Sequence, residues 1–207
     1  MQLVLATQNQ HKVAEFQALF DAAALNVSVV SFDGEAPAET GVSFAENALI
    51  KARAAAQQTG HVAIADDSGI MVDVLGGAPG IFSARWAGAH ASDQANRDLL
   101  LSQLSDIAAE HRGAAFHCEI ALVVPAAQDP EGAGGELTVS GTWPGMLAVE
   151  ESGEHGFGYD PVFIPAGFAI SAAELRPEVK NEHSHRARAF LELVEALRDV
   201  FPAELDS

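Results

Sequence analysis

Two adjacent carboxylates, Asp66 and Asp67, follow a run of mainly apolar residues at 61–65. Such a run, followed by Asp, Ser and Gly, predicts a buried strand that ends at the carboxylates. Open α/β sheets usually form their sites at strand ends of this kind. Two neighbouring anions repel each other, so the pair favours a divalent cation and the oxygens of a polyanionic substrate. Solvated turns prefer the same residue types, so these residues alone leave a plain turn open.

The cations of this chain are few, and its three lysines are Lys12, Lys51 and Lys180. The net charge of −18 argues against a polymeric nucleic-acid partner, which requires basic patches. A small anion is still a candidate ligand. Lysine is a compact point charge that suits phosphate oxygens, so the three lysines are candidate phosphate contacts. Lys12 lies in the first turn of a predicted helix, where a positive charge is mildly unfavourable for the helix. Its position there has two explanations: it contacts an anionic ligand, or it is an ordinary exposed lysine.

The composition predicts one globular domain, or one domain built as two lobes. The chain has 207 residues, of which 48% are hydrophobic and 19% are charged. No apolar stretch is long enough to span a membrane, and the first residues lack the pattern of a signal peptide. The single cysteine, Cys118, excludes an internal disulfide and lies in an apolar run typical of a core. We therefore expect a cytoplasmic protein with no membrane partner.

The hydrophobic pattern predicts alternating strands and helices in the first half and mainly strands in the middle. Strands are expected at 2–6, 27–30, 61–65, 70–75, 114–125, 137–149 (broken at 144–145) and 162–164. Helices are expected at 11–20, 43–58, 92–111 and 184–201. Residues 66–69 are expected to form a corner, and Ser43 with Glu46 forms a capping-box pattern. This order of elements predicts an α/β fold with a mixed sheet.

Several well-known motifs are absent: there is no P-loop, no G-x-G-x-x-G, no C-x-x-C and no H-E-x-x-H. Four other segments occur in a fixed order. They are Thr7-x-Asn9-x-x-Lys12, the stretch 65–69 with 76–85, Gly156-Phe157-Gly158-Tyr159-Asp160-Pro161, and Ser184-His185-Arg186. Together with the helix segment at 43–52 and Lys180, they resemble the inosine triphosphate pyrophosphatases, also described as dITP/XTP pyrophosphatases. The resemblance spans about residues 3–195, and all three lysines fall at family positions.

The resemblance implies an α/β fold with a mixed central sheet flanked by helices. It also implies two lobes with a nucleotide-binding cleft between them, in a single pyrophosphatase domain over residues 1–207. The implied reaction is hydrolysis of dITP, ITP and XTP at the α–β phosphoanhydride to the monophosphate and pyrophosphate. This would remove deaminated purines from the nucleotide pool. The implied cofactor is Mg²⁺, and the implied assembly is a homodimer.

The resemblance also implies roles for individual residues. Asp67 would bind the metal and activate water, Asp66 would support it or act as a second ligand, and Glu39 is a further candidate metal ligand, unless it is a solvated loop residue. The substrate contacts divide between phosphates and base. Phosphate contacts would come from Thr7, Gln8, Asn9, Gln10, His11, Lys12, Lys51, Ser68 and Lys180. Base contacts would come from Phe157, Gly158, Tyr159, Asp160, His185 and Arg186, with Phe157 stacking on the purine unless it is a core aromatic.

One position departs from the family pattern. The first loop more often reads Thr-Gly-Asn, and here Gln8 replaces the glycine. If that position needs a positive φ, glutamine would strain the loop; alternatively its side chain would add a phosphate contact. Two rival functions also remain: a pyrophosphatase for another damaged nucleotide, such as a modified pyrimidine, and a nucleotide sensor without catalysis.

Overall fold

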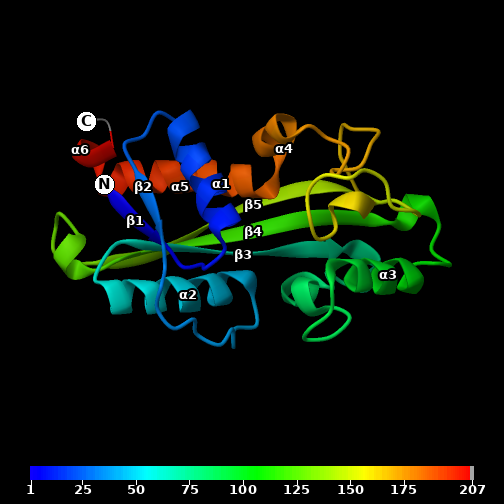
Figure 1. The fold of residues 1–207 in the computed structure, drawn as a ribbon, viewed down its shortest axis with the longest axis horizontal. Helices are drawn as coiled ribbons and strands as arrows, with labels where there is room; N and C mark the ends of the chain where they lie inside the picture. Colours follow the sequence, from blue (N-terminus) through cyan, green and yellow to red (C-terminus); the bar gives the residue numbers. More distant parts are fainter. Residues whose placement is uncertain (206–207) are drawn as a thin grey trace. The chain divides into compact units, whose positions relative to one another are not determined.

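The computed structural model describes residues 1–205, apart from the side chains of His11, Ala203 and Glu204. Its sheet has six strands in the order β2-β1-β3-β4-β5-β6. The strands are β1 Gln2–Leu5, β2 Ser28–Ser31, β3 Ala63–Val72, β4 Gly113–Val124, β5 Gly135–Leu147 and β6 Phe163–Pro165. The α-helices are α1 Gln10–Ala22, α2 Phe44–Thr59, α3 Asp93–Gln103, α4 Pro177–His183, α5 His185–Val200 and α6 Pro202–Leu205. Figure 1 shows these elements along the chain.

Parallel and antiparallel neighbours occur in the same sheet. Strand β1 pairs in parallel with β2 and β3, whereas β5 pairs antiparallel with β6. The mixed α/β sheet flanked by helices is therefore confirmed. The chain divides into two compact units, the first made of 1–67, 119–140 and 189–207 and the second of 68–118 and 141–188.

The first unit holds helices on both sides of its strands. Helix α2 packs Ala48 and Ala52 against Ala65 and other small residues. Figure 1 shows α1 on the side of the strands opposite to α2. There Phe20 of α1 meets Phe190 of α5 edge to face, with ring centroids 4.7 Å apart. Strand β3 is thus covered on both faces, which explains its almost continuous apolar sequence before Asp66.

The second unit has its own hydrophobic core. Trp143 of β5 and Phe163 of β6 are fully buried at its centre, and their rings lie 5.5 Å apart. Phe116 of β4 packs edge to face on Phe163 at 4.7 Å. Helix α3 contributes Leu100 to the same cluster. This core supports the loop that precedes β6 and the end of β3.

Some predicted element boundaries are wrong. The corner expected at 66–69 does not exist, because β3 runs without interruption from Ala63 to Val72. The break expected at 144–145 is also absent: the Pro144 carbonyl accepts from Ala166, and Gly145 pairs with Pro165 of β6. The helix expected at 92–111 ends at Gln103. Helix α4, which carries Lys180, was not predicted.

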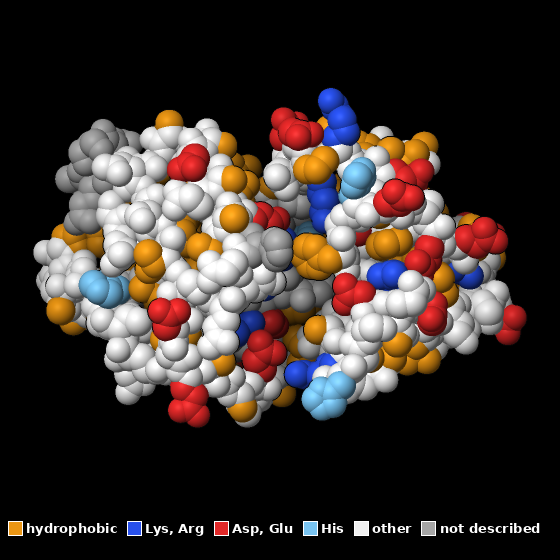
Figure 2. All heavy atoms as spheres, viewed as in Figure 1, with side chains coloured by type: hydrophobic (Ala, Val, Ile, Leu, Met, Phe, Trp, Pro, Cys, Tyr) orange, Lys and Arg blue, Asp and Glu red, His pale blue; other side chains and the backbone are white. Residues whose placement is uncertain are grey.

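The surface carries charges of both signs. On the face in Figure 2, Lys and Arg side chains occur singly or in small groups among more numerous Asp and Glu side chains. Within residues 1–205, no helix has the length and apolar character that a membrane crossing requires.

Candidate functional site

Asp66 and Asp67 point to opposite faces of β3. Successive side chains of a strand alternate between faces, so Asp67 shares a face with Ala65, which packs on α2. Asp66 lies on the other face, where both of its carboxylate oxygens accept from Lys12 Nζ of α1, at 2.9 and 3.0 Å. The expectation that these two anions share one turn is therefore wrong. Each carboxylate instead has its own lysine on its own side of the sheet.

Asp67, Lys51 and Glu39 form a compact ionic cluster. Lys51 Nζ on α2 lies 2.9 Å from Asp67 Oδ1 and 2.9 Å from Glu39 Oε1. Burial raises the pKa of Asp67 above its ordinary value, the charge and hydrogen bond of Lys51 partly offset this, and the charge of Glu39 adds to the rise. Burial alone would lower the pKa of Lys51, but its carboxylate neighbours raise it on balance. Lys51 is therefore a cation at neutral pH, and Asp67 is more basic than an exposed aspartate.

Asn47 connects this cluster to the loop that carries Glu39. It is fully buried on α2, one turn before Lys51. Its Oδ1 accepts from the Gly41 backbone N–H at 2.9 Å, and its Nδ2 donates to Asp67 Oδ2 at 3.4 Å. Asn47 lies within the helix segment 43–52 that supports the resemblance, but it is not among the predicted site residues.

The helix start that presents Asn47 and Lys51 is capped as predicted, with one difference. Ser43 Oγ accepts from the Glu46 backbone N–H at 3.2 Å. The Glu46 carboxylate accepts from Val42 at 2.7 Å instead of from the Ser43 N–H of the usual capping box. The second contact therefore orders the end of the acidic loop as well as the helix.

The loop between β1 and α1 borders the ionic cluster. Thr7 and Gln8 line a cavity of about 140 Å³ together with Glu39 and Lys51. Thr7 Oγ1 accepts from the Asn9 backbone N–H at 3.2 Å. Gln8 is not among the non-glycine residues that have a positive φ in the described backbone, so glutamine adds no left-handed strain there. Its Nε2 donates to the Gly34 carbonyl at 3.5 Å.

The remaining predicted residues of this loop lie at the start of α1. Gln10 is the first residue of α1 and donates from Nε2 to Ser31 Oγ at 3.3 Å. His11 also belongs to α1, but its side chain lies outside the described residues. Lys12 is held by Asp66, so this lysine of the first turn is directed at a carboxylate of the sheet.

The carboxylates of the first unit fit a magnesium ion in part. Asp67 and Glu39 both approach one ammonium group, so their like charges lie close together. Among the described side chains, His, Cys, Asp and Glu form no group of three or more that could hold a metal alone. Mg²⁺ commonly uses one or two carboxylates and takes its other ligands from phosphates and water. Asp67 and Glu39 suit that type of site.

The second unit contains a separate cavity of about 140 Å³, lined largely by the residues predicted to contact a base. The predicted substrate contacts that line it are Ser68, Phe157, Gly158, Tyr159, Asp160, Lys180, His185 and Arg186. His185 is buried and stacks on Phe116, with ring centroids 4.9 Å apart and an angle of 12° between the rings. Arg186 is also buried. Ser68 and Lys180, predicted to serve the phosphates, thus lie beside the candidate base contacts.

Asp160 organises the loop at one side of this cavity. Its Oδ2 accepts from Lys180 Nζ at 2.6 Å and from the Phe157 backbone N–H at 2.8 Å. Lys180 Nζ also lies 5.2 Å from the centroid of the Phe157 ring. Phe157 is 59% exposed, so the core-aromatic interpretation is wrong and its ring is accessible to a ligand.

Tyr159 anchors the same loop through its buried side chain. Its hydroxyl donates to the Ser83 carbonyl at 2.8 Å. Burial raises the pKa of Tyr159 well above its ordinary value, and the nearby charge of Asp93 adds to this effect. Tyr159 is therefore a neutral donor at physiological pH. Its role at the cavity is to fix the loop.

The cavity of the second unit also has two polar lining residues on α3 that the sequence motifs did not indicate. Asp93 and Asn96 of α3 line it, although neither belongs to the motifs that carry the resemblance. Asn96 is buried, and its Oδ1 accepts from Ala87 at 2.8 Å while its Nδ2 donates to the Ala84 carbonyl at 3.2 Å. The sequence offered one signal for Asn96: it is a polar residue on the apolar side of a predicted helix.

Comparisons with known proteins agree on one family. A family model described as the Ham1 family matches residues 3–196. A protein of Leifsonia xyli named dITP/XTP pyrophosphatase is 53% identical over 199 residues, which cover 96% of each chain. A Streptomyces avermitilis protein of the same name is 52% identical and covers 96% of this chain and 98% of its own.

Solved structures give the same result. The structure of a HAM1 protein from Coxiella burnetii has a TM-score of 0.85 at 40% identity, covering 97% of this chain and all of that one. A Mycobacterium abscessus structure titled nucleoside-triphosphatase, dITP/XTP pyrophosphatase, has a TM-score of 0.75 at 45% identity, covering 94% and 99%. The resemblance inferred from four sequence segments is therefore confirmed, and the chain belongs to the Ham1 family.

Proposed function

We propose that this protein hydrolyses dITP, ITP and XTP to the nucleoside monophosphate and pyrophosphate. It would then be a nucleoside-triphosphate pyrophosphatase, a hydrolase acting on acid anhydrides. The cluster of Asp67, Lys51 and Glu39 carries this proposal, because it joins a basic carboxylate, a cation and a second carboxylate. The names of relatives about half identical over nearly full length support the substrate class.

The phosphates would be bound by the first unit. Lys12 and Lys51 are its two lysines, and each forms an ion pair with an aspartate, Asp66 and Asp67 respectively. An incoming triphosphate would share their charge, and backbone N–H groups at the start of α1 would add donors. Thr7, Gln8 and Asn9 would contact the phosphates from the loop before α1.

Asp67 would accept the proton of the attacking water, with Asp66 as a supporting carboxylate that holds Lys12. The raised pKa of Asp67 favours this role, because a general base works best when its pKa is nearer the working pH. Asp67 and Glu39 would hold Mg²⁺. When bound, this ion neutralises phosphate charge and lowers the pKa of water.

The base would occupy the cavity of the second unit. Phe157 would stack on the purine, and Arg186 with the loop N–H groups would read its 6-oxo group. Adenine presents an amino group at that position and would leave these donors unpaired. Each unpaired buried polar group costs about 1–3 kcal/mol, so several together discriminate strongly. We propose further that residues 1–207 form one pyrophosphatase domain that takes up one nucleotide.

The wider setting is part of the same proposal. We expect a cytoplasmic homodimer that acts on free nucleotides and binds neither polymeric nucleic acid nor membranes. The scattered cations of the visible surface support the exclusion of polymers, which require basic patches.

The test is to incubate the protein with dITP and Mg²⁺ and to identify the products. Parallel reactions would contain dATP, dGTP, a modified pyrimidine triphosphate, or dITP with excess chelator. We expect metal-dependent dIMP and pyrophosphate from dITP and little product from the standard purines. Release of phosphate and dIDP would contradict the proposed bond cleavage. Thermal stabilisation by dITP without turnover would favour a sensor.

A further inference from the structure

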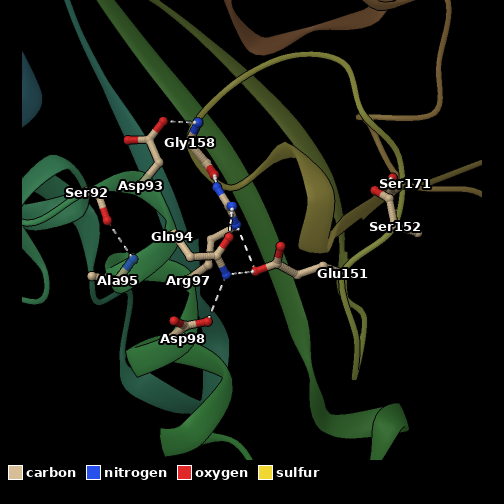
Figure 3. Close-up of polar contacts among 10 residues, drawn as sticks. All are labelled: Ser92, Asp93, Gln94, Ala95, Arg97, Asp98, Glu151, Ser152, Gly158 and Ser171. Atoms are coloured by element: carbon tan, nitrogen blue, oxygen red, sulfur yellow. Dashed lines mark hydrogen bonds and ion pairs between the residues drawn. The ribbon is translucent and has the colours of Figure 1, made fainter.

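The loop that borders the cavity of the second unit is tied to α3 through one peptide unit on each side of Gly158. The Gly158 N–H donates to Asp93 Oδ2 at 2.8 Å, and the Gly158 carbonyl accepts from Arg97 Nη1 at 2.7 Å. Asp93 and Arg97 are four residues apart, so they lie on the same face of the helix. Figure 3 shows both side chains reaching toward Gly158.

Arg97 is held in place by contacts of its own. Its Nε donates to Glu151 Oε1 at 2.9 Å, and its Nη2 donates to Gln94 Oε1 at 2.8 Å. Gln94 Nε2 donates in turn to the same Glu151 oxygen at 2.8 Å. The Arg97 side chain is only 11% exposed, although it is charged. Such a guanidinium is fixed in direction, and Figure 3 shows the resulting network.

Gly158 has a backbone conformation that few other residues adopt, and it directly follows Phe157. Its φ of +60° lies in the left-handed region, where the two α3 contacts hold it. Phe157, which precedes it, is 59% exposed, and Lys180 Nζ lies 5.2 Å from the centroid of its ring. Asp160, two residues later, binds both Lys180 and the Phe157 N–H. The orientation of the Phe157 ring therefore depends on the position of the Gly158 backbone.

We propose that Asp93 and Arg97 are positioning residues for the base half of the site. They hold the Gly158 backbone so that the Phe157 ring stays at the cavity, and they thereby set the affinity for the base without altering phosphate binding. This inference rests on the proposed function, because it requires that the cavity of the second unit receives the purine.

The test separates the two halves of the substrate by product inhibition. For Arg97→Gln and Asp93→Ala, the KM for dITP and the inhibition constant of dIMP should rise about tenfold, the effect of one lost hydrogen bond to a charged group. The inhibition constant of pyrophosphate should not change, and kcat should change less than KM. Asp93→Asn keeps an oxygen acceptor for Gly158 and should restore near wild-type values.

The matched control is Arg53→Gln, which removes an exposed ion pair with Glu136 in the first unit. It should leave both inhibition constants unchanged. Thermal melting would accompany each variant; if Arg97→Gln does not fold, Arg97→Lys keeps the charge but loses the fork of donors.

Three outcomes would overturn the inference. Unchanged dIMP inhibition in Arg97→Gln and Asp93→Ala would show that the loop does not need these contacts. An equal rise in the dIMP and pyrophosphate constants would show a general structural role. An Asp93→Asn variant as impaired as Asp93→Ala would show that the Asp93 charge meets the substrate directly. Absence of wild-type dITP turnover would instead overturn the proposed function itself.

Discussion

Asp66 and Asp67 are neighbours in the sequence but face opposite sides of β3, and each pairs with a different lysine. Lys12 of α1 lies 2.9 Å from Asp66, and Lys51 of α2 lies 2.9 Å from Asp67. The alternation of strand side chains thus assigns each carboxylate to its own helix. Lys51 also contacts a second carboxylate, that of Glu39, at 2.9 Å. The two aspartates should therefore behave differently when substituted.

Asp67→Asn should lower kcat for dITP by about 10²–10⁴-fold, because the variant loses the proposed general base. Asp66→Asn should mainly raise KM, because Lys12 loses the carboxylate that directs it. Steady-state kinetics of both variants, with dITP binding measured by calorimetry, would check this. Equal losses of kcat would mean that the two carboxylates share the proton transfer.

The pH dependence should report on Lys51. Lys51 lowers the pKa of Asp67 against the effect of burial, so Lys51→Met should raise that pKa further. The acidic limb of kcat/KM should then move to higher pH. Lys12→Met is the matched control, because Lys12 is not among the groups that perturb Asp67; its acidic limb should stay in place. A shift in both variants, or in neither, would contradict the assignment of Asp67 as the base.

The same carboxyl group links stability to pH. The pKa of Asp67 is raised by folding, so protonated Asp67 stabilises the folded state relative to the ionised form. This contribution is fully present below the ordinary value of 3.8 and is lost as the pH rises through the folded-state pKa. Asp67→Asn should therefore show a weaker loss of unfolding free energy between acidic and neutral pH than the wild type. Urea titrations at several pH values would measure it.

Local sequence signals indicated the candidate site residues because many of these residues lie on, or next to, a regular helix or strand. Asn47 and Lys51 are four residues apart, so they lie on one face of α2, and both reach Asp67. The apolar run before Asp66 correctly indicated a buried strand. The turn-forming residue types at 66–69 wrongly suggested that this strand ends at Asp66, whereas β3 continues to Val72 because tertiary packing outweighs local residue preference. That error concealed the opposite orientation of the two aspartates.

The contacts between distant segments had no local signal. Asp93 and Arg97 are ordinary polar residues of an exposed helix pattern, and their partner Gly158 is 65 and 61 residues away. Tyr159 reaches Ser83 across 76 residues. Such pairings follow from the course of the whole chain, so periodicity and motifs in one sequence do not predict them.

Asn47→Ala should destabilise the fold and weaken catalysis together. It leaves the half-buried Gly41 N–H without its acceptor, and because a fully buried unsatisfied group costs about 1–3 kcal/mol of unfolding free energy, the loss here should lie at the lower end of that range. The same change removes a hydrogen bond to Asp67 and frees the loop that carries Glu39. Urea unfolding and the Mg²⁺ dependence of kcat would be measured. A stable variant with an unchanged Mg²⁺ requirement would contradict the role of Asn47 in placing Glu39.

Gly156→Ala should impair use of the base more than its backbone strain predicts. Gly156 has a φ of +77°, and a Cβ there would collide with Asp160 Oδ2, the oxygen that binds Lys180. Gly132 is a matched control: its φ is +73°, and a Cβ there would meet nothing within 4 Å. Each alanine should cost about 1 kcal/mol of unfolding free energy through the left-handed backbone. Only Gly156→Ala should also raise the KM for dITP, because the displaced Asp160 carboxylate releases both Lys180 and the Phe157 N–H; an equal KM in the two variants would show that Asp160 does not shape the base pocket.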